Sequence, residues 1–392
     1  MLSTEVQKLC DVHSALFHGT TDYSNKHEKS AALSQVKGHP LQTFTRENEA
    51  LTKLIDRMKE LLHDTDETTG SGSLPVDEKQ VDTGNLPQIA AQLLKIREVA
   101  VHYAKKGDLL YPHLNAGYGI AGPSAVMWTA DDEIRDELGA LCKALQKGRE
   151  AAEQKATGSF QSSQWDVKWL ERLQKVLMRA EEMIYKENHI LFPNCAVNFT
   201  EEDWMGIYRD AKDYADCLGV HGEVWEEAEN WLRKEKEAKK TVFKGTKDSQ
   251  ASEGEEDRAG SNFSDGVIHM PGGHMTIRQL TALLNTIPLE ISFIDAEDRN
   301  CYFNEGPKVF KRAQMALGRS VFTCHPPKVE TMVRRIIGEF REGTLDRVPV
   351  WMDKGGRTML VTYMAVRDES GEYMGTMELV QDMEFAKEHF GK

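Results

Sequence analysis

Apolar residues recur at three- and four-residue steps through the N-terminal half of the chain. The first run follows His39-Pro40, a pair typical of a helix start, and it continues to Leu62. Three later runs have the same period and predict helices near 87–110, from 123 to about 145, and near 165–191. Each of these helices must bury an apolar stripe, so the pattern predicts a four-helix bundle.

The second and fourth predicted helices end alike. Leu110-Tyr111-Pro112 closes one and Leu191-Phe192-Pro193 closes the other, which suits a bundle with two related halves. Shorter helices are predicted near 201–214 and 223–238. From about Lys239 to Gly266 the chain is rich in Ser, Gly, Glu and Asp and nearly lacks large apolar groups, so this segment is predicted to be a linker.

Beyond residue 270 the period changes from helical to alternating. A short helix is predicted over 277–284 and a second one with Val329, Val333, Ile336 and Phe340 on one side. Alternating strands are predicted at 290–295, 301–304, 348–353, 358–366 and 373–381, separated by turns such as Lys354-Gly355-Gly356-Arg357. The second half is therefore predicted to be an α+β domain, an antiparallel five-stranded sheet with helices on one face.

Composition narrows the classes of function. The chain has 392 residues with a formal net charge of -14, which would repel a nucleic-acid backbone, and we expect no nucleic-acid partner. No signal peptide and no apolar stretch of membrane-spanning length is recognisable, so we expect a cytoplasmic protein without a transmembrane segment. The six cysteines are scattered without a C-x-x-C pair, as in a reducing compartment.

Several motifs together resemble a bacterial family. They are QKLCDVHSALFHG, GHPLQTFTRENEAL, GPSAVMWTADDEIR and the two helix ends in the first half, and LLNTIPLEISFIDAEDRNCYF, GRSVFTCHPPK and MLVTYMAVRDESGEYMGTMELVQDM in the second. In that family a domain of unknown function (number 438) precedes a hemerythrin-like HHE cation-binding bundle and a PAS domain. The resemblance implies these domains: a remnant of the first at 1–28, the bundle at 36–215, a helical extension at 216–238, a linker at 239–268 and the PAS domain at 274–386.

Hemerythrin-like bundles hold two irons between histidines and carboxylates of facing helices, which suits oxygen binding or redox sensing. The resemblance places the candidate metal ligands at His39, His102, Asp131 and Glu187. Other expected ligands are replaced, by Gln42 in the first helix, by Lys106 and Gly107 after His102, by Asp131 where a histidine is expected, and by Asn188 beside Glu187. A complete diiron site is therefore not expected.

Three alternatives stay open for the bundle. Asp131 lies four residues after Met127 and Glu187 lies three after Ile184, so both carboxylates should face inward, where a buried charge needs a metal, a cation or hydrogen-bond donors. A polar network could satisfy them through Lys106, His102 or Gln42. The other two alternatives are a mononuclear or altered metal site, and a diiron site that holds iron. The remaining bundle histidines, His113 and His189 among them, are expected at the surface or as caps.

In the PAS domain, Cys324-His325-Pro326-Pro327 stands just before a predicted helix. Cys324 or His325 could bind a haem iron in the cavity between sheet and helices, because thiolate and imidazole are both axial haem ligands. The alternative is a helix N-terminal turn that the prolines stiffen, with His325 hydrogen-bonded locally.

The two-domain layout predicts a sensory or regulatory protein and not an enzyme, with a PAS domain that senses a ligand or dimerises. A homodimer through the PAS domain or an unknown signalling partner protein is expected, since no kinase or DNA-binding output is recognisable after the PAS domain. The alternatives are a non-haem iron protein that handles oxygen or nitric oxide, and a metal-free scaffold.

Overall fold

The computed structural model describes residues 25–67, 86–119, 122–154, 167–244, 266–306 and 308–391. It divides into two compact units near residue 225, which we describe separately. Most of the predicted N-terminal remnant at 1–28 lies outside the described residues, as do 68–85 between the first two bundle helices and 245–265 of the predicted linker.

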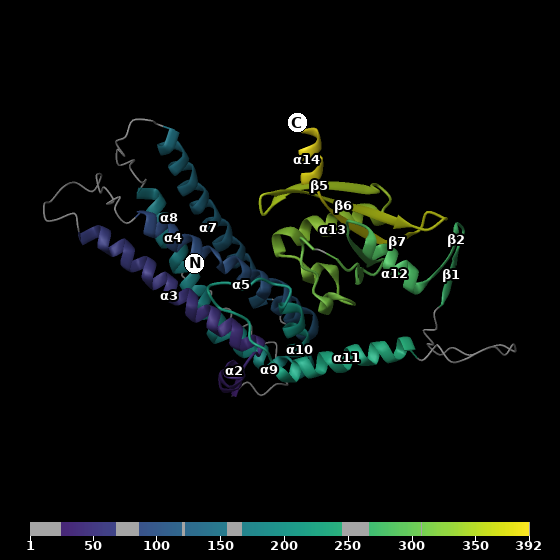
Figure 1. Ribbon diagram of the computed structural model, residues 1–392, viewed down its shortest axis with the longest axis horizontal. Coiled ribbons are helices and arrows are strands. Elements are labelled where there is room, and N and C mark those ends of the chain that lie inside the picture. The colour runs from purple at the N-terminus through teal and green to yellow at the C-terminus, as the bar shows by residue number, and fades with distance from the viewer. Residues whose placement is uncertain are drawn as a thin grey trace. The chain divides into compact units, whose positions relative to one another are not determined.

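The first unit is helical, as predicted (Figure 1). Its α-helices are α2 (Lys26–Ser34), α3 (Pro40–Glu67), α4 (Leu86–Arg97), α5 (Val99–Lys105), α6 (Tyr111–Tyr118), α7 (Gly122–Gln154), α8 (Val167–Lys186), α9 (Phe192–Asn198) and α10 (Glu201–Ala211). The apolar stripes predicted from the sequence form the core. Leu51 and Ile55 of α3, Leu141 of α7 and Leu173 of α8 are each 1% exposed or less.

Two π-helical turns interrupt the bundle at matching places. One, η4, spans Lys106–Leu110 between α5 and α6, and the other, η5, spans Glu187–Leu191 between α8 and α9. Each is followed by a helix with proline at its second residue, Pro112 or Pro193. Proline has no N–H to continue an α-helical ladder, and a π turn inserts an extra residue that shifts the hydrogen-bond pattern there. The two related helix ends seen in the sequence therefore have the same backbone conformation.

The start of α3 is fixed by its flanking residues. Gly38 has φ +76°, and a Cβ added there would lie 2.4 Å from the backbone carbon of Val224. His39 follows, and its Nδ1 accepts a hydrogen bond from the N–H of Leu41 at 3.1 Å, as a helix cap does. Glycine is thus required at 38 both for its dihedral angle and for the close approach of the chain.

The second unit carries the sheet, in the strand order β4-β3-β7-β6-β5, and every neighbouring pair is antiparallel. Its elements are α11 (Glu226–Lys244), β1 (Val267–Met270), β2 (Gly273–Thr276), α12 (Ile277–Thr286), β3 (Glu290–Asp295), β4 (Asn300–Phe303), the 3-10 turns η6 (Gln314–Ala316) and η7 (Val321–Cys324), α13 (Pro327–Arg341), β5 (Arg347–Lys354), β6 (Arg357–Arg367), β7 (Tyr373–Asp382) and α14 (Glu384–Phe390). The predicted α+β fold is confirmed.

The predicted linker at 239–268 overlaps ordered structure at both ends. Helix α11 continues to Lys244, six residues into the predicted linker, and β1 begins at Val267. β1 and β2 form a hairpin that the sequence did not predict. Two strands of four residues each, joined by Pro271 and Gly272, are too short to produce a recognisable alternating pattern.

The turn between β5 and β6 has the geometry that its sequence predicts. Lys354 pairs with Arg357 in the ladder, so the loop has only Gly355 and Gly356, with φ of +63° and +78°. Two successive positive φ angles are those of a type I′ turn, which glycine adopts without strain.

One face of the sheet is covered by α13. Val333 and Ile337 of this helix pack with Ile294 of β3 and Val321 of η7. A second apolar cluster, Met359, Val361 and Val380, lies farther along β6 and β7. Glu290, Val380 and Val361 are paired across three strands, as are Ser292, Glu378 and Tyr363, so these side chains all point to the same face.

Candidate functional site

Polar and charged side chains from α3, α5, η4, α6, α7 and η5 meet in the interior of the bundle, and we call them the buried charge cluster. Its members are Glu47 (α3), His102 and Lys105 (α5), Lys106 (η4), Tyr111 (α6), Asp131 (α7) and Glu187 (η5). None is more than 6% exposed, and His102, Lys106 and Glu187 are 0% exposed. Charged residues buried to this degree are rare unless they are paired.

His102 joins two carboxylates. Its Nδ1 lies 2.7 Å from Glu47 Oε2 and its Nε2 lies 2.9 Å from Glu187 Oε2. An ionised carboxylate only accepts hydrogen bonds, so both ring nitrogens must donate and the ring is an imidazolium. Burial alone would lower the pKa of His102, but the charges and hydrogen bonds of Glu187 and Glu47 outweigh burial and raise it.

Lys106 joins two carboxylates as well. Its ammonium donates to Asp131 Oδ1 at 3.0 Å and also to Glu187 Oε1, while it lies 4.4 Å from the centre of the Tyr103 ring. Burial would raise the pKa of Glu187, but Lys106 and His102 outweigh it and lower that pKa. Burial dominates for Asp131, whose pKa is raised despite Lys106.

The cluster ends at a neutral group on one side and a cation on the other. The Tyr111 hydroxyl donates to Asp131 Oδ2 at 2.7 Å, and the Lys105 ammonium donates to Glu47 Oε1. Burial would raise the pKa of Glu47, but His102 and Lys105 together lower it. The cluster is therefore a set of ion pairs in the bundle core and not an isolated buried charge.

Of the candidate metal ligands, the structure brings together His102, Asp131 and Glu187, with Lys106 between the two carboxylates. His39 lies apart. It is packed between the rings of Trp204 and Trp225, with both centroids 4.7 Å away, and burial lowers its pKa to about 4. Eight residues of helical rise, about 12 Å, separate it from Glu47 along α3.

Gln42 does not take part in the cluster, although the sequence left that alternative open. Its side-chain oxygen accepts the N–H of Gly38 at 2.8 Å, one turn before it. Asn188, which follows Glu187, is exposed and accepts a hydrogen bond from Asn48 at 3.2 Å. Of the two places expected for His113, the surface is wrong, because it is 5% exposed; it pairs at 2.7 Å with Asp203, a member of the α10 capping box.

Three cluster members were not recognised from the sequence. Glu47 lies three residues after Phe44 and four before Leu51, on the apolar face of α3, so its position did carry a signal. Lys105 and Tyr111 lie on either side of η4. The extra residue of a π turn changes which side chains face inward. Helical periodicity alone therefore does not predict that Lys105 and Tyr111 face the core.

The PAS candidates lie at a closed part of the domain. His325 follows η7, and its Nδ1 lies 2.8 Å from the carbonyl oxygen of Val321, which is the local hydrogen bond of the alternative interpretation. Burial lowers the pKa of His325. Cys324 Sγ accepts a hydrogen bond from Asn300 Nδ2 at 3.5 Å. The cavity beside His325 measures only about 10 Å³, room for about one water molecule.

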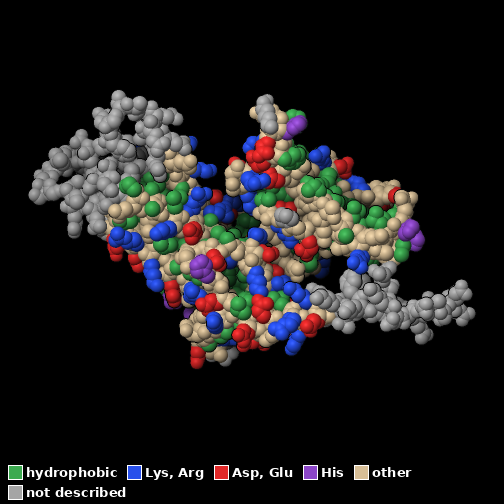
Figure 2. Space-filling view, viewed as in Figure 1, with side chains coloured by type: hydrophobic (Ala, Val, Ile, Leu, Met, Phe, Trp, Pro, Cys, Tyr) green, Lys and Arg blue, Asp and Glu red, His purple; other side chains and the backbone are tan. Residues whose placement is uncertain are grey.

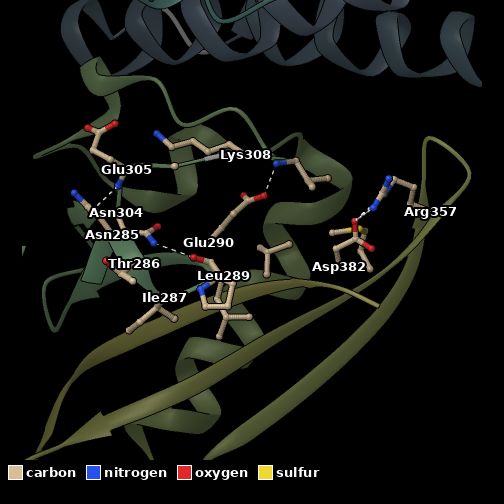
Figure 3. Close-up of a pocket in the computed structure, with 15 residues that line it drawn as sticks. Asn285, Thr286, Ile287, Leu289, Glu290, Asn304, Glu305, Lys308, Arg357 and Asp382 are labelled. Atoms are coloured by element: carbon tan, nitrogen blue, oxygen red, sulfur yellow. Dashed lines mark hydrogen bonds and ion pairs between the residues drawn. The ribbon is translucent and has the colours of Figure 1, made fainter. Parts of the chain in front are cut away.

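A much larger cavity opens at the other end of the same sheet face, with a volume of about 470 Å³ (Figure 3). Glu290 stands among the lining side chains, and its carboxylate accepts the N–H groups of Val309 and Phe310. Arg357 and Asp382 meet at one side with an N–O distance of 2.7 Å. The lining combines these groups with an apolar set: Ile287, Pro288, Leu289, Val309, Met359 and Val380.

No helix among the described residues is long and apolar enough to cross a membrane. No curated protein matched the chain. Among solved structures, the C-terminal domain of a protein from Streptococcus mutans is 36% identical over 32% of this chain and 98% of that one, with a TM-score of 0.31. A sensory box sensor histidine kinase from Vibrio cholerae is 12% identical over 27% of this chain and 89% of that one, with a TM-score of 0.21.

A third solved structure, a VqmA–ligand–DNA complex from Vibrio cholera, is 21% identical over 30% of this chain and 60% of that one, with a TM-score of 0.23.

Two family models match the chain itself. That of the hemerythrin HHE cation binding domain matches residues 39–195, and that of the PAS domain matches residues 280–384. Both domains suit a sensory or regulatory role. The chain thus joins a hemerythrin HHE cation binding domain to a C-terminal PAS domain.

Proposed function

We propose that this protein is a sensory or regulatory protein whose PAS domain binds a small organic ligand, and whose hemerythrin-like bundle is a metal-free scaffold. The observation that carries the proposal is the contrast between the two interiors. The charged side chains buried in the bundle are paired with one another, whereas the PAS domain has a cavity of about 470 Å³.

Hemerythrin HHE domains can bind iron, so the fit of this bundle to iron has to be tested on its own residues. Lys106 places a buried ammonium on Asp131 and Glu187, the two carboxylates best placed to hold a cation. Both nitrogens of His102 are engaged with carboxylates. Among the described residues, no group of three or more His, Cys, Asp and Glu side chains has a metal-binding arrangement. This donor set does not fit a diiron centre.

Haem does not fit the PAS residues proposed for it. The cavity that His325 lines has room for about one water molecule, far less than a porphyrin needs. His325 hydrogen-bonds to its own turn. A haem ligated by His325 or Cys324 would require α13 to separate from β3, against the packing of Val333 and Ile337 on Ile294.

The large PAS cavity has the properties of a small-molecule site. Its volume falls within the range of about 300–1,000 Å³ typical of ligand pockets, and it combines an apolar lining with a few polar groups. Glu290 uses its carboxylate for two backbone N–H groups, and a carboxylate has lone pairs left to accept a further donor. Arg357 and Lys308 offer cationic donors at the same cavity.

A ligand survey tests this assignment. The full-length chain is purified and denatured, the released small molecules are identified by mass spectrometry, and a metabolite library is screened by thermal unfolding. We expect a compound that raises the melting temperature of the wild type but not of Ile287→Trp, which fills the cavity. Leu345→Trp, at an exposed position of the same domain outside the cavity, should respond like the wild type. If no compound separates the two variants, the proposal is wrong.

We also propose that the PAS unit self-associates. Helix α12 is amphipathic, yet none of its residues is buried, and Ile277 and Leu283 are 37% and 47% exposed. Val267 and Ile268 of the neighbouring hairpin are exposed too. Hydrophobic side chains are visible at the surface of this unit in Figure 2. A second copy of the same face would bury them, as in an isologous dimer.

A further inference from the structure

Glu290 is an almost completely buried carboxylate in the wall of the large PAS cavity. The residue is 8% exposed and is the first of β3, where its side chain points to the same sheet face as Val361 and Val380. Figure 3 shows its carboxylate among the lining side chains, with the Arg357–Asp382 pair to one side. A carboxylate in such a place is costly unless other groups compensate its charge.

The backbone contacts of Glu290 use half of its capacity to accept hydrogen bonds. Its Oε1 accepts the N–H of Val309, and its Oε2 accepts the N–H of Phe310 at 3.3 Å. An ionised carboxylate has about four lone-pair sites on its two oxygens. About one site on each oxygen is therefore left, and a single cationic group with two N–H donors can bind both oxygens at once, as in a bidentate pair.

The two N–H groups are neutral, so the negative charge of Glu290 still needs a partner. Among the described residues, the carboxylate has these two backbone donors and no ion pair. Arg357, a cation of the same lining, donates to Asp382 at 2.7 Å, so its charge is already matched. Lys308 also lines the cavity but forms no ion pair with Glu290.

The charges on this sheet face do not balance. Arg312 donates to Glu378 at 2.6 Å, and Glu378 lies on the same face as Glu290. Burial lowers the pKa of Arg312, but Glu378 and Glu290 outweigh burial and raise it, so both carboxylates act on one guanidinium. His325 adds no charge at neutral pH, because burial lowers its pKa. One negative charge is left in excess at the cavity wall.

The rest of the cavity wall is suited to a carbon skeleton. Apolar side chains from the start of β3, from β6 and from β7 surround the carboxylate, and they are Ile287, Pro288, Leu289, Met359 and Val380. A hydrated inorganic cation would leave this surface uncovered, whereas an organic cation would bury it. In a cavity with such walls an ion pair is also stronger than it is in water.

We propose that the PAS cavity binds a small organic cation, whose N–H groups donate to both oxygens of Glu290 and whose carbon skeleton packs on the apolar lining. Primary amines, amidines and guanidines have this chemistry. An acid is disfavoured because its carboxylate would face the carboxylate of Glu290. The inference rests on the proposed function, since it names the chemical class of the ligand that the cavity is proposed to bind.

The test is a calorimetric titration of the full-length chain with two organic cations and their neutral counterparts of similar shape. The pairs are benzamidine with benzamide, and cyclohexylmethylamine with cyclohexylmethanol. We expect at least one cation to bind about 10-fold more tightly than its counterpart, because only the cation makes charge-assisted hydrogen bonds. Ile287→Trp, which fills the cavity, should abolish this binding, and Leu345→Trp should retain it.

A second pair of variants locates the cation within the cavity. Glu290→Gln keeps the shape of the side chain and removes its charge, so it should weaken binding of the cation by about 10–100-fold. Its effect on the neutral counterpart should be small. Glu305→Gln removes an exposed carboxylate from the same lining and should change the affinity by less than about 5-fold. Circular dichroism checks that both variants fold, and if Glu290→Gln does not, the wild type and Ile287→Trp decide.

Three outcomes overturn the inference. One is that neither cation binds more tightly than its neutral counterpart. Another is binding that Ile287→Trp leaves intact, as at some other acidic place on a chain with a net charge of -14. The third is a folded Glu290→Gln variant that binds the cation as tightly as Glu305→Gln does.

Failure of the inference and failure of the proposed function give different results. A neutral or acidic compound that the ligand survey finds, and that Ile287→Trp blocks, overturns the inference and leaves the proposed function standing. A survey in which no compound separates Ile287→Trp from Leu345→Trp overturns the ligand site itself.

Discussion

The ammonium of Lys106 lies 3.0 Å from Asp131 Oδ1 in the core of the bundle, and neither side chain is more than 2% exposed. Lys106 comes from a π turn and Asp131 from the first third of α7, so the pair links this turn, where the helical register is interrupted, to a second helix. A buried ion pair of this kind adds little net stability, but losing one partner is costly because the other stays charged and buried.

Lys106→Met keeps the length of the side chain and removes its charge. We expect it to lower the free energy of unfolding by about 3–5 kcal/mol, because Asp131 and Glu187 lose a shared cation. Urea unfolding measures the difference. Arg57→Met is the control, since Arg57 and Glu60 form an exposed pair on α3 worth no more than about 1 kcal/mol. Equal effects of the two substitutions would contradict the account.

Two buried tyrosines give a matched test of the hydrogen bond at the end of the cluster. Tyr111 donates to Asp131, whereas the hydroxyl of Tyr103 is buried without a hydrogen-bond partner among the described residues. Tyr111→Phe should cost about 1.5–3 kcal/mol, the range for a hydrogen bond to a charged group. Tyr103→Phe should be neutral or stabilising. The reverse order in chemical denaturation would show that Asp131 does not depend on Tyr111.

His39 should make stability fall in acid. Burial lowers its pKa to about 4, below the unfolded value of 6.5, so the folded state favours the neutral ring. The stabilisation is complete above pH 6.5 and is lost as the pH falls through 4. His39→Asn, which can still cap α3, lacks this titration. Between pH 7 and pH 4 the wild type should lose about 3 kcal/mol more than the variant. Parallel pH profiles would rule this out.

The exposed face of α12 makes a prediction about association. Leu283→Asp should convert a dimer to a monomer in light scattering coupled to size-exclusion chromatography, because it places a charge in the proposed interface. Leu345→Asp is the control. Leu345 is 41% exposed in the same domain but lies between α13 and β5, so this variant should remain dimeric. A monomeric wild type, or a dimer that Leu283→Asp leaves unchanged, would contradict the proposed self-association.

The fold could be predicted from the sequence because its signals are local and repeated. The stripe through Leu51 and Ile55 and the turn at Gly355-Gly356 each depend on residues a few positions apart. The β1–β2 hairpin was missed because its strands are too short to have a period.

The cluster could be predicted only in part. Asp131 and Glu187 are buried, as their spacing indicated, and Lys106 lies between them. The partners of Asp131 and Glu187 depend on the two π turns and on the packing of helices that are far apart in the sequence. No local sequence pattern predicts either of these features. His39 was grouped with the other candidate metal ligands for the same reason, although it lies at the start of α3 and packs against Trp204 and Trp225, apart from the cluster.

The most direct test of the central claim is the iron content and visible spectrum of the full-length wild type, purified without added metal and then incubated anaerobically with Fe²⁺ before desalting and exposure to air. With Lys106 on both Asp131 and Glu187, the protein should retain no stoichiometric iron and should be colourless. Iron retained in stoichiometric amounts, with the charge-transfer bands of an oxo-bridged centre, would contradict the claim that a lysine has taken the place of the metal.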